Sequence, residues 1–167
     1  MVAALVATAA CQARAQRHTS PPAHTAVDIA GRHISVDYYA PSMYGRKVMG
    51  SLVPFNTVWC TGANYATQIV HDAPLQMGTL KLPKGQQSIW TLPTAQEWTL
   101  IINNRTGQFH LDYDSSTDLG RTKMDLKTLP SPVETFKIEL RPQGGNKGVL
   151  ALIWERTEAS IPFTVLP

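Results

Sequence analysis

The sequence predicts an all-β fold: a single-domain antiparallel β-sandwich, jelly-roll-like, of about nine or ten strands. Short runs of alternating apolar and polar residues recur along the chain, and turn-forming residues separate them at fairly even spacing. No segment carries a convincing helical apolar stripe. The chain has 167 residues, which fits one domain and is long enough to bury a substantial core.

The first predicted hairpin surrounds Gly31 and Arg32. Residues 27–29 and 34–39 flank this pair as two strands, and glycine is a residue type that tight hairpin turns favour. Within 34–39 apolar residues alternate with Ser35 and Asp37, so one face is expected in the core and the other in solvent.

The remaining predicted strands follow the same pattern. They are residues 66–71, 88–92, 98–103, 109–113, 122–126, 136–140, 150–154 and 161–165. Residues 83–85, 93–95 and 104–107 contain the proline, glycine and asparagine of turns. Residues 42–52 are expected to hold at most one short turn of helix.

The N-terminus predicts export. An apolar run that ends by Cys11 is followed by Ala13-Arg14-Ala15, the small-x-small pattern of a signal peptide cleavage site, so residues 1–15 are predicted to be a signal peptide. An alternative cut would make Cys11 a lipid-bearing first residue, because residues 8–11 resemble a lipoprotein box. The apolar run is too short to cross a bilayer. We therefore expect a periplasmic or secreted protein of the bacterial envelope with no transmembrane span.

The rest of the chain is modest in charge and contains a single cysteine. Residues 16–24 are polar and proline-rich and are expected to be a flexible lead-in to a domain at 25–167. Charged residues make up 16% of the chain, and its formal net charge is +3. That charge is too small to indicate a nucleic-acid partner. Either cut leaves Cys60 without a disulfide partner in the mature chain, so the fold is expected to depend on its core.

Two adjacent segments carry a family resemblance. YAPSMYGRKVMGSLVPF at 39–55 and VWCTGANYAT at 58–67 resemble the DUF2911 family, a bacterial domain of unknown function. LPKG at 82–85, WTLP at 90–93, EWTLIIN at 97–103, LIWE at 152–155 and PF at 162–163 fit the same family. The resemblance implies an exported single domain and no established activity.

The chain departs from the family pattern at two positions. Cys60 stands where the family has arginine, and Tyr65 stands where it has glutamate. These two charges either served a function in relatives or formed a structural ion pair. We favour the ion pair, since losing both partners together leaves no stranded charge.

Residues 59–64, which we call the corner, are the first candidate site. Gly62 and Asn64 tolerate positive φ, and Thr61 can hydrogen-bond nearby backbone, so a tight turn explains much of the pattern. The functional alternative is a binding site, because Thr61 and Asn64 offer a hydroxyl and an amide beside the ring of Trp59.

Tyr44 and Arg46 are the second candidate. They lie in a predicted loop, where a guanidinium can hold a carboxylate or phosphate in bidentate fashion. The structural alternative is that Arg46 fastens its own loop to backbone carbonyls.

Catalytic and metal-binding alternatives are weaker. Cys60 would need an activating histidine, and no motif places one beside it, so a buried inert thiol is favoured. His110 and Asp112 are predicted on one face of a strand, which would suit an acid–base pair. His33 and Asp37 share a face in the same way, but the sequence identifies no third ligand for a metal.

The sequence contains no serine-hydrolase elbow and no phosphate-binding loop, and it indicates no cofactor. Of the four tryptophans, Trp90, Trp98 and Trp154 lie in predicted strands and are expected in the core rather than in a glycan platform. We expect a non-catalytic module that binds a small molecule, a glycan or an envelope protein. The alternatives are an enzyme of unknown reaction that uses the corner with His110 and Asp112, and a structural envelope component.

Overall fold

The computed structural model describes residues 19–167, so the predicted leader and Cys11 lie outside the described residues. The described chain forms nine strands: β1 (Pro22–Ile29), β2 (Arg32–Tyr39), β3 (Thr67–His71), β4 (Leu75–Met77), β5 (Leu80–Leu82), β6 (Gly85–Pro93), β7 (Trp98–Asn103), β8 (Asp118–Pro142) and β9 (Lys147–Val165). All pair antiparallel in one sheet of order β1-β2-β3-β6-β7-β8-β9-β4-β5. The predicted all-β antiparallel class is confirmed.

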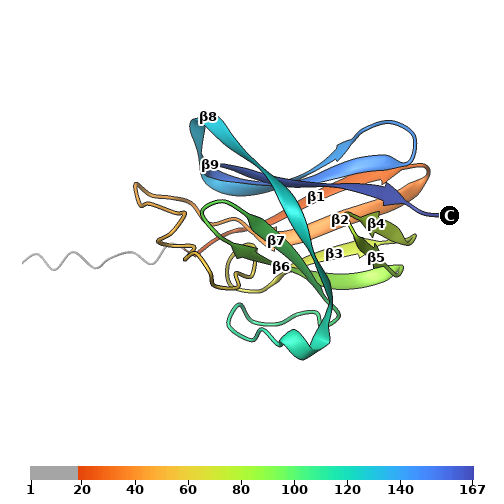
Figure 1. Ribbon diagram of the computed structural model, residues 1–167, viewed down its shortest axis with the longest axis horizontal. Helices are drawn as coiled ribbons and strands as arrows, with labels where there is room; N and C mark the ends of the chain where they lie inside the picture. Colours follow the sequence, from red (N-terminus) through yellow and green to blue (C-terminus); the bar gives the residue numbers. More distant parts are fainter. Residues whose placement is uncertain (1–18) are drawn as a thin grey trace, which may run out of the picture.

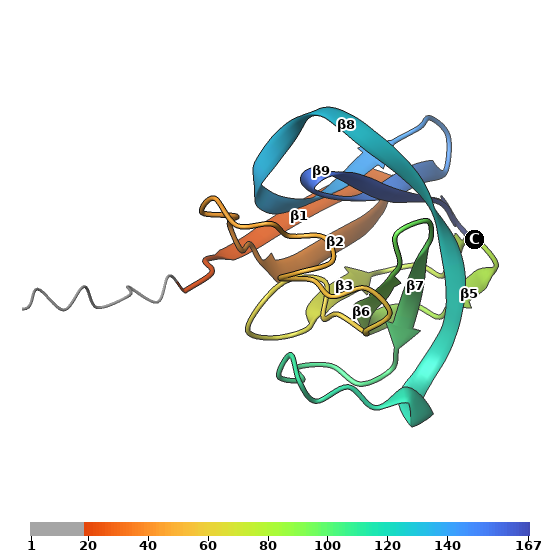
Figure 2. The same cartoon turned by 60° about the vertical axis from the view of Figure 1, so that its left-hand side comes forward.

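The sheet folds over on itself through its two longest strands. The first part of β8 pairs with β7, and its second part pairs with β9. Figure 2 shows β8 arching from the lower edge of the molecule across its top, where β9 lies beside it. The half made of β8 and β9 therefore covers the half made of β1, β2, β3, β6 and β7 (Figure 1). The two layers of the predicted sandwich are parts of one hydrogen-bonded sheet.

A pair of prolines interrupts the ladder of β8. Thr128 pairs with Thr157 and Val133 with Glu155, so residues 129–132 of β8 stand opposite Arg156 alone. Proline has no N–H to donate, and Pro130 and Pro132 cannot continue the ladder. The Arg156 guanidinium donates instead to the carbonyl of Pro130 at 2.6 Å. This interruption explains why the sequence predicts two strands, 122–126 and 136–140, where the structure has one.

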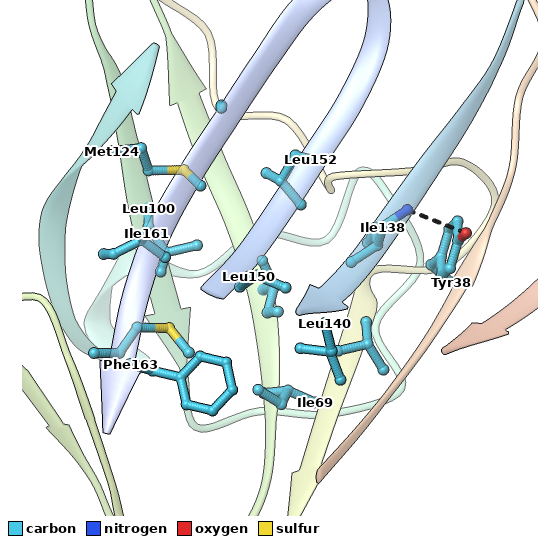
Figure 3. Packing of buried hydrophobic residues seen from close by; sticks show 14 of the residues in the cluster. Tyr38, Ile69, Leu100, Met124, Ile138, Leu140, Leu150, Leu152, Ile161 and Phe163 are labelled. Atoms are coloured by element: carbon cyan, nitrogen blue, oxygen red, sulfur yellow. Dashed lines mark hydrogen bonds between the residues drawn. The ribbon is translucent and has the colours of Figure 1, made fainter. Parts of the chain in front are cut away.

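The main core fills the space between the two halves. Figure 3 shows side chains of β8 and β9, among them Leu140, Leu150 and Phe163, gathered over Ile69 of β3 and Leu100 of β7. The N–H of Ile138 donates to the phenolic oxygen of Tyr38 at 3.1 Å, which satisfies the hydroxyl of a side chain that is only 8% exposed. Burial of this apolar surface is the main source of stability, at about 25 cal/mol per Å².

A second, smaller core lies on the other face of β6 and β7. It contains Cys60, Ala66, Trp90 and Ile101. The run Leu100-Ile101-Ile102 is fully buried because both faces of β7 are covered, one by the main core and one by this cluster. The corner (residues 59–64) is therefore part of the packed structure, since it contributes Cys60 to this second core.

Several strand boundaries differ from the prediction. β7 matches its predicted range, whereas β1 begins at Pro22, three residues before Thr25, and so includes the end of the predicted lead-in. The short strands β4 and β5 were not predicted. Residues 42–52 hold turns and isolated bridges rather than helix, and the one helical turn described is η1 (Ser115–Thr117).

The predicted strand at residues 109–113 is wrong. The segment lies in the long loop between β7 and η1, and the N–H of Asp112 donates to the carbonyl of Phe109 at 2.9 Å, which closes a turn. Phe109 is 43% exposed and Leu111 is 75% exposed. Two residues of the alternation that suggested a strand therefore lie on the surface, while the third, Tyr113, packs against Trp90 of the smaller core.

Candidate functional site

The corner continues the line of β3 along the edge of β6. β3 pairs with β6 as far as Ile89, and beyond that point Trp59 pairs with Thr91 of β6 in an isolated antiparallel bridge. Its N–H donates to the Thr91 carbonyl at 2.8 Å, and the Thr91 N–H donates back at 2.9 Å. The chain then turns through residues 61–64 and enters β3, where the Thr67 N–H donates to the Cys60 carbonyl at 3.1 Å. The corner is thereby fixed to the sheet on both sides.

Thr61 holds the conformation that was expected of Gly62. Thr61 has a φ of 57° and Asn64 a φ of 60°, whereas Gly62 is not among the positive-φ residues. A β-branched residue in the left-handed region is strained, and the surroundings must hold it there. Thr61 is fully buried, its hydroxyl lies 3.2 Å from that of Thr91, and its carbonyl accepts a 2.6 Å bond from the Thr67 hydroxyl.

Gly62 is required for close approach instead. A Cβ at this position would lie 3.0 Å from the Tyr39 carbonyl oxygen and 3.2 Å from the Thr67 hydroxyl. The expectation of a positive φ at Gly62 is wrong, because the turn places its left-handed residues on either side of the glycine. The glycine lets the corner pack directly against the backbone of β2.

Asn64 joins three parts of the chain. Its side-chain amide donates to the Ser20 carbonyl at 3.3 Å, and its own carbonyl accepts the His110 N–H at 3.0 Å. The next residues, Tyr65 and Phe109, form an isolated antiparallel bridge. The corner, the start of the described chain and the loop after β7 therefore lie side by side, at the end of the molecule seen on the left of Figure 2.

Trp59 is part of the core as much as of the corner. Its ring stacks on Trp154 with centroids 6.0 Å apart and meets Phe136 at 5.1 Å edge-on, and its Nε1 donates to the Gly62 carbonyl at 3.0 Å. Trp90, Trp98 and Trp154 are buried. Trp59 is thus half-buried among other rings, and only part of it is exposed to the groove.

A hollow of about 440 Å³ opens at the corner, and we call it the corner groove. Its lining consists of Leu52, Pro54, Thr57, Val58, Trp59, Cys60, Gly62, Ala63, Asn64, His110 and Leu111. Three other hollows on the molecule measure about 220, 240 and 270 Å³. The corner groove is mostly apolar, with the hydroxyl of Thr57, the amide of Asn64 and the imidazole of His110 as its polar side-chain groups.

The sequence-predicted site residues separate into two groups. Trp59 and Asn64 line the corner groove, and Thr61 is buried beneath it. Tyr44 and Arg46 are exposed and do not line it. Arg46 donates to the carbonyls of Met43 and Ser42, both at 2.9 Å, and its guanidinium lies 5.8 Å from the Tyr44 ring centroid. These bonds fasten the 42–46 loop to itself.

Cys60 is a buried thiol. It is 4% exposed, and burial raises the pKa of its thiol from an ordinary 9.0 to about 12. At neutral pH the thiolate, which is the nucleophilic form, is therefore scarcely populated. Tyr65, the other departure from the family pattern, is 47% exposed and packs against Tyr39 and Phe109. The two residues thus belong to different surroundings.

The histidine and aspartate pairs are rearranged. His110 lines the corner groove but Asp112 does not, because both lie in a turn rather than on one face of a strand. His33 contacts Asp28 at 2.8 Å, and Asp37 contacts His24 at 2.7 Å, so each pairs across to β1. Across the described part of the chain, no three His, Cys, Asp or Glu side chains form a metal-binding group.

The sequence reasoning missed the apolar walls of the groove. Leu52, Pro54 and Val58 come from the loop before the corner, and Leu111 comes from the loop after β7. Leu52 is 40% exposed and Leu111 is 75% exposed. The sequence signal for these groove residues is a leucine that lies between turn residues, outside any predicted strand that would bury it.

Fold and site together define a single antiparallel β-domain with a loop-built apolar groove at one end. Residues 20–163 match the family described as protein of unknown function (DUF2911). The chain therefore belongs to this family, as the resemblance of residues 39–55 and 58–67 implied. Comparison with curated proteins and with solved structures gave no match. Within residues 19–167, no helix is both long and apolar enough to cross a bilayer.

Proposed function

We propose that the protein is a non-catalytic binding domain that holds a small amphipathic molecule in the corner groove. The observation that carries the proposal is the lining of the groove, in which an apolar wall surrounds a few polar groups. Sites for small molecules are typically concave, mostly apolar and about 300 to 1,000 Å³ in volume. At about 440 Å³ the groove falls within that range.

The exposed leucines supply a reason for a ligand to bind. Leu111 is 75% exposed and Leu52 is 40% exposed. Covering this apolar surface would gain about 25 cal/mol per Å². The apolar body of the ligand would lie on Leu52, Val58 and Leu111, and its hydrogen-bonding group would meet Asn64 and His110, whose imidazole can donate or accept.

Binding is favoured over catalysis by the chemistry of the lining. The Cys60 thiol has a pKa raised to about 12, and the groove lining includes no carboxylate to orient His110 as a base. A glycan is disfavoured in this groove because Trp59, its one aromatic side chain of a size to stack on a sugar, already packs against Phe136 and Trp154.

We further propose that the domain works in the bacterial envelope after removal of residues 1–15, or anchored through a lipid on Cys11. Ser20, which accepts a bond from Asn64, lies where the described chain enters the domain, beside the corner groove. Ser20 is nine residues beyond Cys11 in the sequence, a separation that an extended chain could span over at most about 30 Å. A lipid anchor would hold the groove close to a membrane, a source of amphipathic molecules. The intact mass of protein from an envelope fraction tests this, and unprocessed protein in the cytoplasm would contradict it.

Binding itself is tested with N-phenyl-1-naphthylamine, a neutral apolar probe whose fluorescence increases in apolar sites. We expect saturable binding to the wild-type domain. Leu111→Ser removes an apolar wall, and Ala63→Phe fills the groove, so each should weaken probe binding about tenfold. The matched control is Leu126→Ser, because Leu126 is also an exposed leucine (37%) but lines a different hollow.

Thermal melts accompany each titration, so that a variant that fails to fold is recognised. Equal probe affinity in wild type, Leu111→Ser and Ala63→Phe would contradict the proposal. So would a loss of affinity that occurs only in Leu126→Ser. Absence of saturable binding to the wild-type domain would favour a purely structural role for the corner.

A further inference from the structure

A second hollow, separate from the corner groove, lies on the outer face of the sheet where β1, β2 and β3 meet. It measures about 240 Å³ and is lined by Pro22, Ala23, Asp37, Tyr38, Tyr39, Tyr65, Ala66 and Gln68. Tyr65 lines this hollow and forms a bridge with Phe109, whose next residues in the chain, His110 and Leu111, line the corner groove. We call it the tyrosine hollow.

Two aromatic rings form one wall of the tyrosine hollow. The Tyr39 and Tyr65 ring centroids are 6.1 Å apart, with a 39° angle between the rings. Phe109 packs against Tyr65 in an edge-to-face arrangement, with ring centroids 5.9 Å apart. Tyr65 remains 47% exposed although its neighbours hold it in place. A rigid exposed ring of this kind can bind a ligand with little loss of side-chain entropy.

Two polar side chains stand beside the rings. Asp37 of β2 pairs in register with Gln68 of β3, so that their side chains project next to each other from one face of the sheet. His24 contacts Oδ1 of Asp37, which leaves Oδ2 able to accept. The Gln68 carbonyl oxygen accepts from Gln86, so the Gln68 amide group keeps its two N–H donors. A carboxylate acceptor and an amide donor are therefore available beside the aromatic wall.

We propose that the tyrosine hollow binds one pyranose ring of a neutral glycan. A pyranose has an apolar C–H face, which suits an aromatic ring, and an edge of neighbouring hydroxyls that both donate and accept. The Asp37 carboxylate would accept from one hydroxyl and the Gln68 amide would donate to the next. Ala23 and Ala66 line the hollow with single methyl groups, which leaves the space in front of the rings open. This site does not depend on the ligand of the corner groove.

The test is saturation-transfer-difference NMR with maltotriose and with triacetylchitotriose. We expect at least one of the two to bind the wild-type domain at millimolar or lower Kd. Tyr65→Ala should weaken that binding about tenfold, whereas Tyr65→Phe should retain most of it. Asp37→Asn should weaken it several-fold, since it replaces a charged acceptor with a neutral amide. Tyr65 and Asp37 are exposed, so these variants should fold, and a melt verifies this.

Leu111→Ser separates this proposal from the function of the corner groove. It should leave sugar binding unchanged even though it weakens binding of the naphthylamine probe. The proposal is overturned if neither sugar binds the wild type, or if Tyr65→Ala binds as tightly as wild type. Aromatic surfaces also bind proline-rich peptides, so decaproline is included, and binding of decaproline without either sugar would likewise overturn it.

Discussion

Replacement of Gly62 by alanine should destabilise the protein although Gly62 has no positive φ. The added Cβ would lie 3.0 Å from the Tyr39 carbonyl oxygen and 3.2 Å from the Thr67 hydroxyl. Neither neighbour can move easily. Tyr39 is held in register with Pro22 of β1, and the Thr67 hydroxyl already donates to the Thr61 carbonyl at 2.6 Å.

The expected magnitude combines two opposing effects. Overpacking of this kind typically costs about 1 to 3 kcal/mol. The smaller entropy of the unfolded alanine chain returns about 0.4 to 1 kcal/mol. We therefore expect Gly62→Ala to lower the free energy of unfolding by about 1 to 2 kcal/mol. In a domain of about 150 residues each kcal/mol shifts the Tm by about 2 to 4 °C, so the expected fall in Tm is about 2 to 8 °C.

Gly120→Ala is the matched control. Its Cβ would come even closer to a neighbour, 2.6 Å from Cδ2 of Leu80, but that atom is the end of a flexible, partly exposed side chain. We expect a cost below about 1 kcal/mol, because Leu80 can change rotamer. Urea and thermal unfolding followed by circular dichroism measure both variants. If Gly120→Ala is the more damaging, or Gly62→Ala is harmless, the close approach of the corner to β2 does not require a glycine.

The remaining predictions concern Arg46 and Cys60. Arg46→Ala should lower the free energy of unfolding by less than about 1 kcal/mol and leave naphthylamine binding unchanged, because within residues 19–167 the Arg46 side chain donates to two carbonyls of its own loop and does not line the groove. A tenfold loss of probe affinity in titrations would contradict this. Cys60→Ala should cost about 1 to 2 kcal/mol in urea unfolding and preserve probe binding. Burial raises the Cys60 pKa from 9.0 to about 12, so the unfolded thiol ionises first and stability should fall as pH rises from 9 to 12. Burial also raises the pKa of Tyr113 to about 12, so Tyr113 makes stability fall over part of the same pH range. The test is therefore whether the free energy of unfolding of Cys60→Ala falls less than that of wild type between pH 9 and 12. An equal fall would contradict the prediction.

The strands were predictable where local signals agree with the fold. Residues 98–103 are bounded by turns and bury both faces, and the prediction matched β7. The length of β8 was not predictable, because Pro130 and Pro132 break the pattern while the strand resumes beyond them. β8 can continue past the prolines because it contacts Arg156 and β9, which are distant in sequence. Local strand propensity therefore could not predict this continuation.

The corner was predictable as a tight turn but its geometry was not. Residue types indicated positive φ at Gly62, yet buried hydrogen bonds hold Thr61 in that conformation instead. The choice is made by tertiary contacts with Thr91 and Thr67, which sequence patterns do not reveal. For Arg46 the sequence left two roles open, binding of an anion and attachment of its own loop, and in the structure Arg46 donates to carbonyls of that loop.

The groove walls show why sites of this kind are hard to predict. Val58 precedes the corner in sequence, but Leu111 reaches it only because His110 bonds the Asn64 carbonyl and Phe109 bridges to Tyr65. The same alternation at 109–113 suggested a strand. An apolar residue that lines a surface groove and one that lies in a core are identical in a local pattern, and they differ only in what covers them.

The central claim, that the corner groove is the binding site, is tested most directly by amide chemical-shift mapping with N-phenyl-1-naphthylamine. The ¹H–¹⁵N spectrum of the assigned domain is recorded as the probe is added. We predict that the largest shifts fall on residues 57–60, 62–64 and 110–111, which line the groove. Largest shifts on residues 94–98 and 126–128, around the hollow that Leu126 lines, or shifts spread evenly over the molecule, would contradict the claim.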